Sequence, residues 1–139
     1  NNVNIADFIS ENKELLKMLE TKKSEADKLL NNADLDNINA MIEELEMKIN
    51  TLTVKNTDEM YKKVIDLFKD LSIKIDEVKA KNKEEVEKKI ADLKVKITDE
   101  KTKSDFESQI KECEDLLKKE EYRQSFEKAN EIEKNIGTE

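Results

Sequence analysis

The side chains in this sequence that could do chemistry are carboxylates and a single thiol, that of Cys113. Aspartate and glutamate together occupy 34 of the 139 positions, so neighbouring carboxylates are frequent. A pair that works as general acid and base needs burial or a cleft that separates its two pKa values. Here the carboxylates lie at positions such as Glu43, Glu44 and within residues 84–87, on the polar faces of expected helices. We therefore expect a solvated, charged surface and no catalytic pair.

Cys113 lies between Ile110 and Leu117 on an apolar stripe, where a small apolar side chain would serve equally well. The chain has no histidine to activate the thiol, and the adjacent Glu112 and Glu114 disfavour the thiolate. The spacing predicts a buried packing residue and neither a nucleophile nor a redox sensor. A single cysteine also excludes an internal disulfide, which is typical of the cytoplasm, although helical proteins of the cell surface also manage without one.

Metal and cofactor sites are disfavoured by residue types that are missing. Without histidine there is no imidazole ligand, and the Glu-x-x-His pairs of di-iron bundles are excluded. Residues 34–37 offer oxygen ligands, but they lack the glycine turn and the terminal glutamate of a calcium loop. One glycine in the whole chain excludes a glycine-rich phosphate loop. We expect no metal, no cofactor and no enzyme.

The charge balance restricts the partners. The net charge is −8, and Arg123 is the only arginine among 26 basic residues. Nucleic acids and anionic membranes are bound by clustered cations, so neither is expected as a direct partner. No apolar run approaches the roughly 20 residues of a membrane span, so membrane insertion is not expected either.

The elements that carry these side chains are predicted to be helices. With no proline and one glycine, the chain cannot supply the frequent turns of a β-sandwich or a parallel sheet. Its apolar residues recur at spacings of three and four, the pattern of one helix face. This pattern marks six segments, namely 4–31, 34–52, 57–81, 83–98, 105–118 and 121–136. The prediction is an all-α protein, an antiparallel bundle of about six helices.

Capping residues mark the breaks between these segments. Ser104 followed by Glu107 is a capping-box pattern, and Asn82 followed by Glu85 is a weaker one. Thr57 is a further cap, and Asn31, Asn32 and Asp34 form the first break. Short connections of this kind require neighbouring helices to run antiparallel.

The segment 57–81 carries an apolar arc about 160° wide, typical of a helix packed against two neighbours. We therefore interpret residues 1–139 as a single elongated helical domain. Two three-helix bundles that share this long central helix are one arrangement, and a single compact bundle is the other. The apolar stripe of residues 38–49 recurs at 86–97, which suggests related subrepeats at 34–71 and 82–117. Any two amphipathic hairpins would align in this way, so duplication and coincidence both stay open.

Three apolar residues lie off the stripes of their own segments. Met47 and Val95 each lie about 180° from the nearby stripe, at matching places in the two subrepeats, and Ile73 is similarly displaced. Single exposed hydrophobic residues are common and need no function. The alternative is that Met47, Ile73 and Val95 contact a protein partner or a second copy of the chain.

Residues 57–117 consist of a long helical segment, a short break and the hairpin sequence EEVEKKIADLKVKITDEKTKSDFESQIKECEDLL. This order resembles the C-terminal helical lid of the seventy-kilodalton heat-shock chaperones, in which a long helix leads into a small acidic, lysine-rich bundle. The resemblance implies a cover over bound polypeptide and no ATP hydrolysis. The 139 residues do not include the β-sandwich of that family or its Glu-Glu-Val-Asp ending, so no substrate-contact residue is transferred.

The function favoured by these observations is a non-enzymatic helical module for protein–protein interaction or scaffolding. The first alternative is a chaperone-lid-like domain, and the second is the helical domain of a surface adhesin. A protein partner is expected in each case, with self-association as one form of it.

Overall fold

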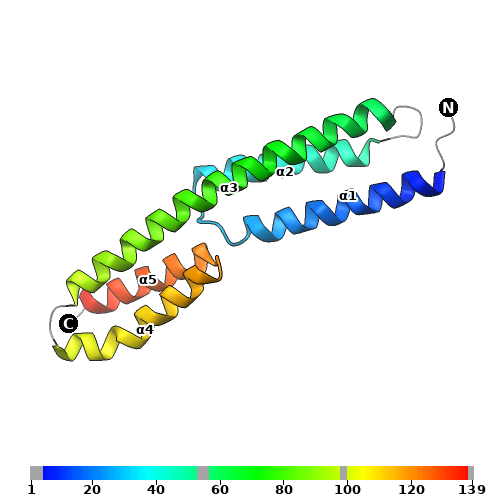
Figure 1. Ribbon diagram of the computed structural model, residues 1–139. Helices are drawn as coiled ribbons and strands as arrows, with labels where there is room; N and C mark the ends of the chain where they lie inside the picture. Colours follow the sequence, from blue (N-terminus) through cyan, green and yellow to red (C-terminus); the bar gives the residue numbers. More distant parts are fainter. Residues whose placement is uncertain (1–4, 53–56, 98–99, 138–139) are drawn as a thin grey trace. The chain divides into compact units, whose positions relative to one another are not determined.

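A computed structural model of the protein describes residues 5–52, 57–97 and 100–137, with side chains described for 12–52, 58–97 and 103–136. The described residues form five helices and no strand (Figure 1). The helices are α1 (Ile5–Ala26), α2 (Ala33–Asn50), α3 (Thr57–Lys96), α4 (Glu100–Lys118) and α5 (Tyr122–Gly137). The prediction of an all-α protein is confirmed.

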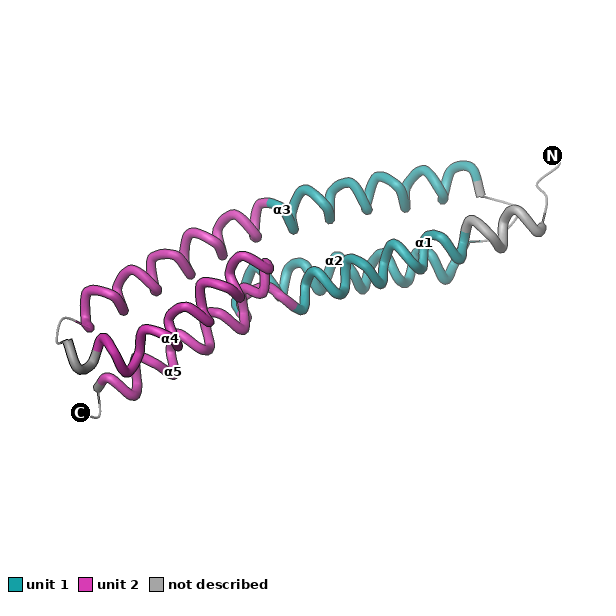
Figure 2. Tube along the Cα trace, turned by 60° about the horizontal axis from the view of Figure 1, so that its bottom comes forward, with its two compact units in different colours: residues 1–27, 32–76 teal, residues 28–31, 77–139 magenta. Residues whose placement is uncertain are grey.

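The chain divides into two compact units, coloured separately in Figure 2. Unit 1 comprises Asn1–Asp27 and Asn32–Asp76, and therefore holds α1, α2 and the first half of α3. Unit 2 comprises Lys28–Asn31 and Glu77–Glu139, and holds the second half of α3 with α4 and α5. The proposed subrepeats stay a prediction.

The expected break at Asn82 is wrong, so the described residues form five helices and the expected number was six. α3 continues for 40 residues through Asn82, whose side chain is buried. An asparagine inside a helix costs less than about 1 kcal/mol relative to alanine. The buried positions Val78, Asn82 and Val86 follow at intervals of four, so one continuous face joins the two stripes. Burial of that face outweighs the weak capping preference of a single asparagine.

The expected start of a helix at Ser104 is also wrong, because α4 begins at Glu100 and contains Ser104. With no proline or glycine nearby, the helix continues past the capping box toward its N-terminus. Thr57 is another expected cap, and its side chain is not among those that the structure describes. The break at Asn31 and Asn32 is confirmed, but α1 ends at Ala26, before the expected residue 31, and Asp34 lies inside α2. The Asn32 Oδ1 atom accepts hydrogen bonds from the backbone N–H groups of Asp34 (3.0 Å) and Leu35 (3.3 Å), so Asn32 is the N-cap of α2.

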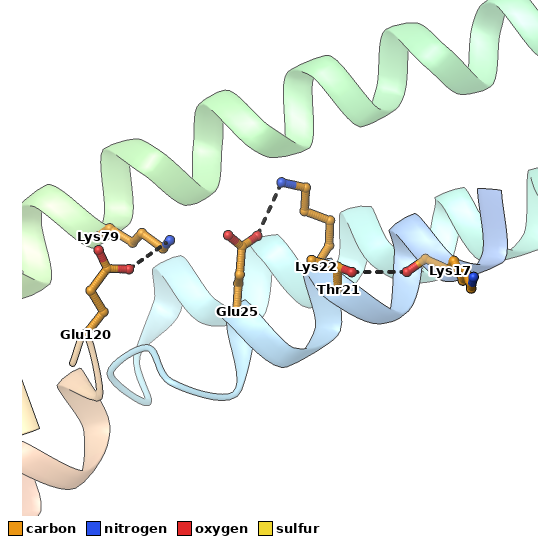
Figure 3. Close-up of polar contacts among 6 residues, drawn as sticks. All are labelled: Lys17, Thr21, Lys22, Glu25, Lys79 and Glu120. Carbon is orange, nitrogen blue, oxygen red and sulfur yellow. Dashed lines mark hydrogen bonds and ion pairs between the residues drawn. The ribbon is translucent and has the colours of Figure 1, made fainter. Parts of the chain in front are cut away.

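Unit 1 has an interior of large aliphatic side chains. Its buried residues on α2 are Leu35 and the stripe expected from the sequence, Ile38, Ile42, Leu45 and Ile49. Ion pairs join its helices: Lys23 on α1 lies 2.6 Å from Glu46 on α2, and Lys74 on α3 lies 3.9 Å from Asp34 on α2. A further pair, Lys22–Glu25, lies within α1 (Figure 3).

Unit 2 brings α4 and α5 together through small side chains. Ser125, fully buried on α5, donates a hydrogen bond from its Oγ atom to the backbone carbonyl of Cys113 at 2.7 Å. Ala129, one turn further along α5, is also fully buried. Side chains this small leave room for the backbones to approach, so α4 and α5 form the closely packed helix pair of unit 2.

Ion pairs attach α3 to the other two helices of unit 2. The carboxylate of Glu133 on α5 forms ion pairs with the Nζ atoms of both Lys89 (2.7 Å) and Lys96 (2.6 Å). Lys79 lies 3.3 Å from Glu120, which ends the α4 region (Figure 3). Glu120 has a φ of 62°, and the Glu121 N–H donates to the Leu116 carbonyl at 2.9 Å. This is a Schellman-type helix end, in which a glutamate occupies the left-handed position that glycine usually takes.

The short segment Lys28–Asn31 belongs to unit 2 because it binds the start of α5. Arg123 donates its backbone N–H to the Lys28 carbonyl at 2.8 Å and its Nε–H to the Leu29 carbonyl at 2.9 Å. Lys28 also forms an ion pair with Glu121 at 3.6 Å. Arg123 therefore has a structural role, attaching a connecting segment to a helix.

Candidate functional site

The three residues expected to contact a partner are all exposed. The exposed fractions are 69% for Met47 on α2, 58% for Ile73 on α3 and 71% for Val95 further along α3. Met47 and Ile73 belong to unit 1, and Val95 belongs to unit 2. Their exposure is what a contact role requires, but contact with a partner stays a prediction.

Within unit 1, Met47 and Ile73 do not form one surface. The Lys74–Asp34 ion pair places residue 34 of α2 beside residue 74 of α3, and the two helices run antiparallel (Figure 1). The same register places Met47 near residue 61, so Ile73 lies about 18 Å further along the helix axis. Met47 and Ile73 are therefore separate exposed hydrophobic positions on unit 1.

Unit 2 contains an open groove between α3 and α4, which we call the α3–α4 groove. It consists of two adjoining pockets of about 460 Å³ and about 830 Å³. Lys94 and Glu114 line both pockets and form an ion pair across the groove at 3.5 Å. The apolar lining residues are Ile90, Ala91, Ile97, Ile110, Leu117 and Tyr122.

Val95 flanks this groove on its α3 side. Ala91 lines the groove, and Val95 follows it by four residues, which is about 40° further around the helix. Of the three expected contact residues, Val95 is therefore the one that adjoins a concave surface. The apolar floor together with Val95 forms a strip bordered by charged side chains.

The charges along the α4 wall alternate in sign. The lining positions Lys103, Glu107, Lys111, Glu114 and Lys118 follow one another at spacings of three or four, so they share one side of α4. Glu114 binds Lys94, but Glu107 and Lys111 make no ion pair within the part of the chain whose side chains are described. Glu107 and Lys111 are thus exposed charges on this side of α4, with no ion pair among the described side chains.

The groove offers little for covalent chemistry. Tyr122, at its edge, is buried, and burial raises the pKa of its phenol. Cys113 is fully buried nearby on α4, and burial raises the pKa of its thiol to about 11. At neutral pH that thiol is protonated and enclosed, so the prediction of a packing cysteine is confirmed.

Two further features bear on the chemistry of the described residues. Among the side chains of residues 12–52, 58–97 and 103–136, no three cysteines or carboxylates gather where they could hold a metal ion. Among the described helices, none combines the length and the apolar character of a membrane span.

Reasoning from the sequence missed the groove, although one signal for it was present. The alternation of charge along one side of α4 is visible in the residue spacing, but which helix faces that side depends on the tertiary structure. It also missed Arg123, whose partners Lys28 and Leu29 are more than ninety residues away in the chain.

The fold defines an all-α protein, and the groove is its best-formed candidate site. No protein-family model, curated protein or solved structure matches the chain.

Proposed function

We propose that the chain is a non-enzymatic helical module for protein–protein interaction, and that the α3–α4 groove is its binding surface. The observation that carries the proposal is an open groove whose apolar floor lies between two charged rims, with exposed Val95 beside it. Grooves of this kind accept the apolar face of an amphipathic helix while their rims select the partner by charge. In this proposal α3 is shared by two three-helix bundles, one in each unit.

The length of the groove supports a helical partner over a small molecule. Its lining on α3 extends from Lys83 to Ile97, which is about 21 Å of helix axis. That length matches about four turns of a bound helix. The apolar area is divided by the Lys94–Glu114 pair, so the floor presents two shallow sites in series and no enclosed pocket.

Site-specific photo-crosslinking tests the proposal. A photoreactive amino acid at Val95, beside the groove, is expected to form discrete protein crosslinks in a native extract. The control position is Glu85, which is exposed and lies on the opposite side of α3 from the groove. Crosslinks of equal yield at both positions, or none at Val95, would contradict a groove-specific role.

A second variant adds a loss-of-binding test. Ala91→Glu places a charge on the apolar strip, and we expect it to abolish the Val95 crosslinks. Ala91 is exposed, so its replacement should leave thermal unfolding unchanged, as followed by circular dichroism. Crosslinks that survive this change at full yield would place the partner elsewhere on the chain.

The chaperone-lid-like function is favoured by one separate observation, the 40-residue α3 that leads into the pair α4 and α5. A lid-like domain would bind many unfolded chains with little preference among them. Titration with a permanently unfolded, fluorescently labelled polypeptide separates the two proposals. Saturable binding that Ala91→Glu leaves unchanged would favour the lid, whereas no binding would favour the specific module. The surface-adhesin alternative stays a prediction.

A further inference from the structure

We propose that the partner of the α3–α4 groove is a second copy of this chain, and that the two copies pair antiparallel through α4. This inference rests on the proposed function and names its partner. Its basis is the run of alternating charges on the groove side of α4, formed by Lys103, Glu107, Lys111 and Glu114. Two copies of such a run bring opposite charges together only in particular registers.

The register we propose is antiparallel about a two-fold axis near residue 109. In that register Glu107 of each copy lies opposite Lys111 of the other, because their numbers are symmetric about 109. Lys103 likewise lies opposite Asp115 of the other copy. Each contact occurs twice, as the symmetry of such a dimer requires. Opposite charges therefore meet along about three turns of helix.

Other registers of the same two helices place like charges together. A parallel, in-register pair sets Glu107 against Glu107 and Lys111 against Lys111. An antiparallel pair centred on residue 111 sets Lys111 against itself and Glu107 against Asp115. Since like charges facing one another are destabilising, these two registers are disfavoured, whereas the register centred near residue 109 brings opposite charges together.

The surface around this stripe is suited to a second helix. Ser104 and Ser108 line the groove and are exposed on α4, so a second helix can approach closely there. Across the groove, Ala91 and Val95 on α3 provide the apolar surface that such a helix would cover. The contact is largely polar, so we expect a dimer that weakens in high salt.

Sedimentation equilibrium of the full chain over a wide range of concentrations tests this inference. The wild-type chain is expected to dimerise at physiological salt and to dissociate more readily at about 1 M salt, where the screening length falls to about 3 Å. A chain that stays monomeric at every concentration would overturn the proposal.

Charge-reversal variants test the register. Glu107→Lys or Lys111→Glu alone turns two attractions into two repulsions, so each should weaken dimerisation about tenfold or more. The double variant Glu107→Lys/Lys111→Glu exchanges the two charges, keeps the net charge, and should restore dimerisation. The control Asp105→Lys makes the same charge change as Glu107→Lys on an exposed position about 160° around α4 and should have little effect.

The outcomes separate this inference from the function on which it rests. A double variant that dimerises no better than the single ones would overturn the antiparallel register. A monomeric wild-type chain that still forms Val95 crosslinks to another protein would overturn self-pairing and leave the binding module intact. A wild-type chain that neither dimerises nor forms Val95 crosslinks would overturn both self-pairing and the proposed binding module.

Discussion

The two units of this protein fill their interiors in different ways. In unit 1, α2 buries only large aliphatic side chains, as at Ile38, Leu45 and Ile49. In unit 2, α5 buries Ser125 and Ala129, and a buried hydroxyl bonds directly to the backbone of α4. Unit 2 also buries large apolar side chains, such as Leu93 and Ile132, so the difference lies in the small side chains of α5.

Unit 2 also carries the proposed binding surface. Its helices α4 and α5 form a close pair, and α3 meets α4 across an open groove that the Lys94–Glu114 ion pair bridges. Substitutions in the two units can test this comparison.

The largest expected effect is loss of apolar volume in unit 1. Leu45→Ala should lower the free energy of unfolding by about 2–5 kcal/mol, since Leu45 is fully buried and its removal leaves a cavity. Urea denaturation followed by circular dichroism measures the change. The control Met47→Ala, two residues away but 69% exposed, should stay within about 0.5 kcal/mol of wild type. Equal losses in the two variants would mean that Leu45 is not a core residue.

The next effect concerns the close α4–α5 contact of unit 2. Ala129→Leu inserts a large side chain where none fits and should destabilise the protein by about 1–3 kcal/mol. The matched change at exposed Ala80, Ala80→Leu, should cost about 0.5 kcal/mol or less. Thermal and urea unfolding measure both. If Ala129→Leu were neutral, small side chains would not be what holds α4 close to α5.

A stabilising change is expected at Asn82, the polar residue in the buried face of α3. Its side chain is 1% exposed, and its Nδ2 atom has no hydrogen-bond partner among the described atoms. Burying an amide group without a hydrogen bond destabilises the folded state. Leucine has nearly the same shape and no polar group, so Asn82→Leu should raise the free energy of unfolding by about 1 kcal/mol. Chemical denaturation measures the gain. A loss of stability would show that the amide does find a partner.

The smallest effect is electrostatic and depends on pH. Hydrogen bonds from Lys89 and Lys96 lower the pKa of Glu133 from 4.5 to about 2. The charged form is thus favoured in the folded state, and its contribution is present above pH 4.5 and disappears as the pH falls toward 2. Glu133→Gln should therefore melt at a slightly lower temperature than wild type at pH 7, with the gap closing near pH 2.

The control for this pH dependence is Glu127→Gln, on the exposed part of the same helix, α5. Its melting temperature should differ little from that of the wild type. A Glu133→Gln gap that stayed constant down to pH 2 would mean that the paired lysines do not stabilise the carboxylate.

Much of the fold could be predicted from the sequence, and two errors of prediction fall at residues that can also act as caps. The apolar stripe of α2, Ile38 to Ile49, is buried as expected, and so are Val86, Ile90, Leu93 and Ile97 at the end of α3. The two errors are Asn82 and Ser104, both of which lie inside a helix. A capping preference is worth about 1 kcal/mol. At Asn82 the burial of a continuous apolar face exceeds it, and at Ser104 no proline or glycine stops the helix.

The sequence by itself determined that this protein is helical, which face of each helix is apolar, and that Cys113 is a packing residue. Each of these follows from residue type and spacing along one helix. Only the tertiary structure decided that α3 is continuous, that Arg123 binds Lys28 and Leu29, and that a groove opens between α3 and α4. These features depend on distances between helices, which are set by how side chains from several segments pack together and not by the pattern within any one of them.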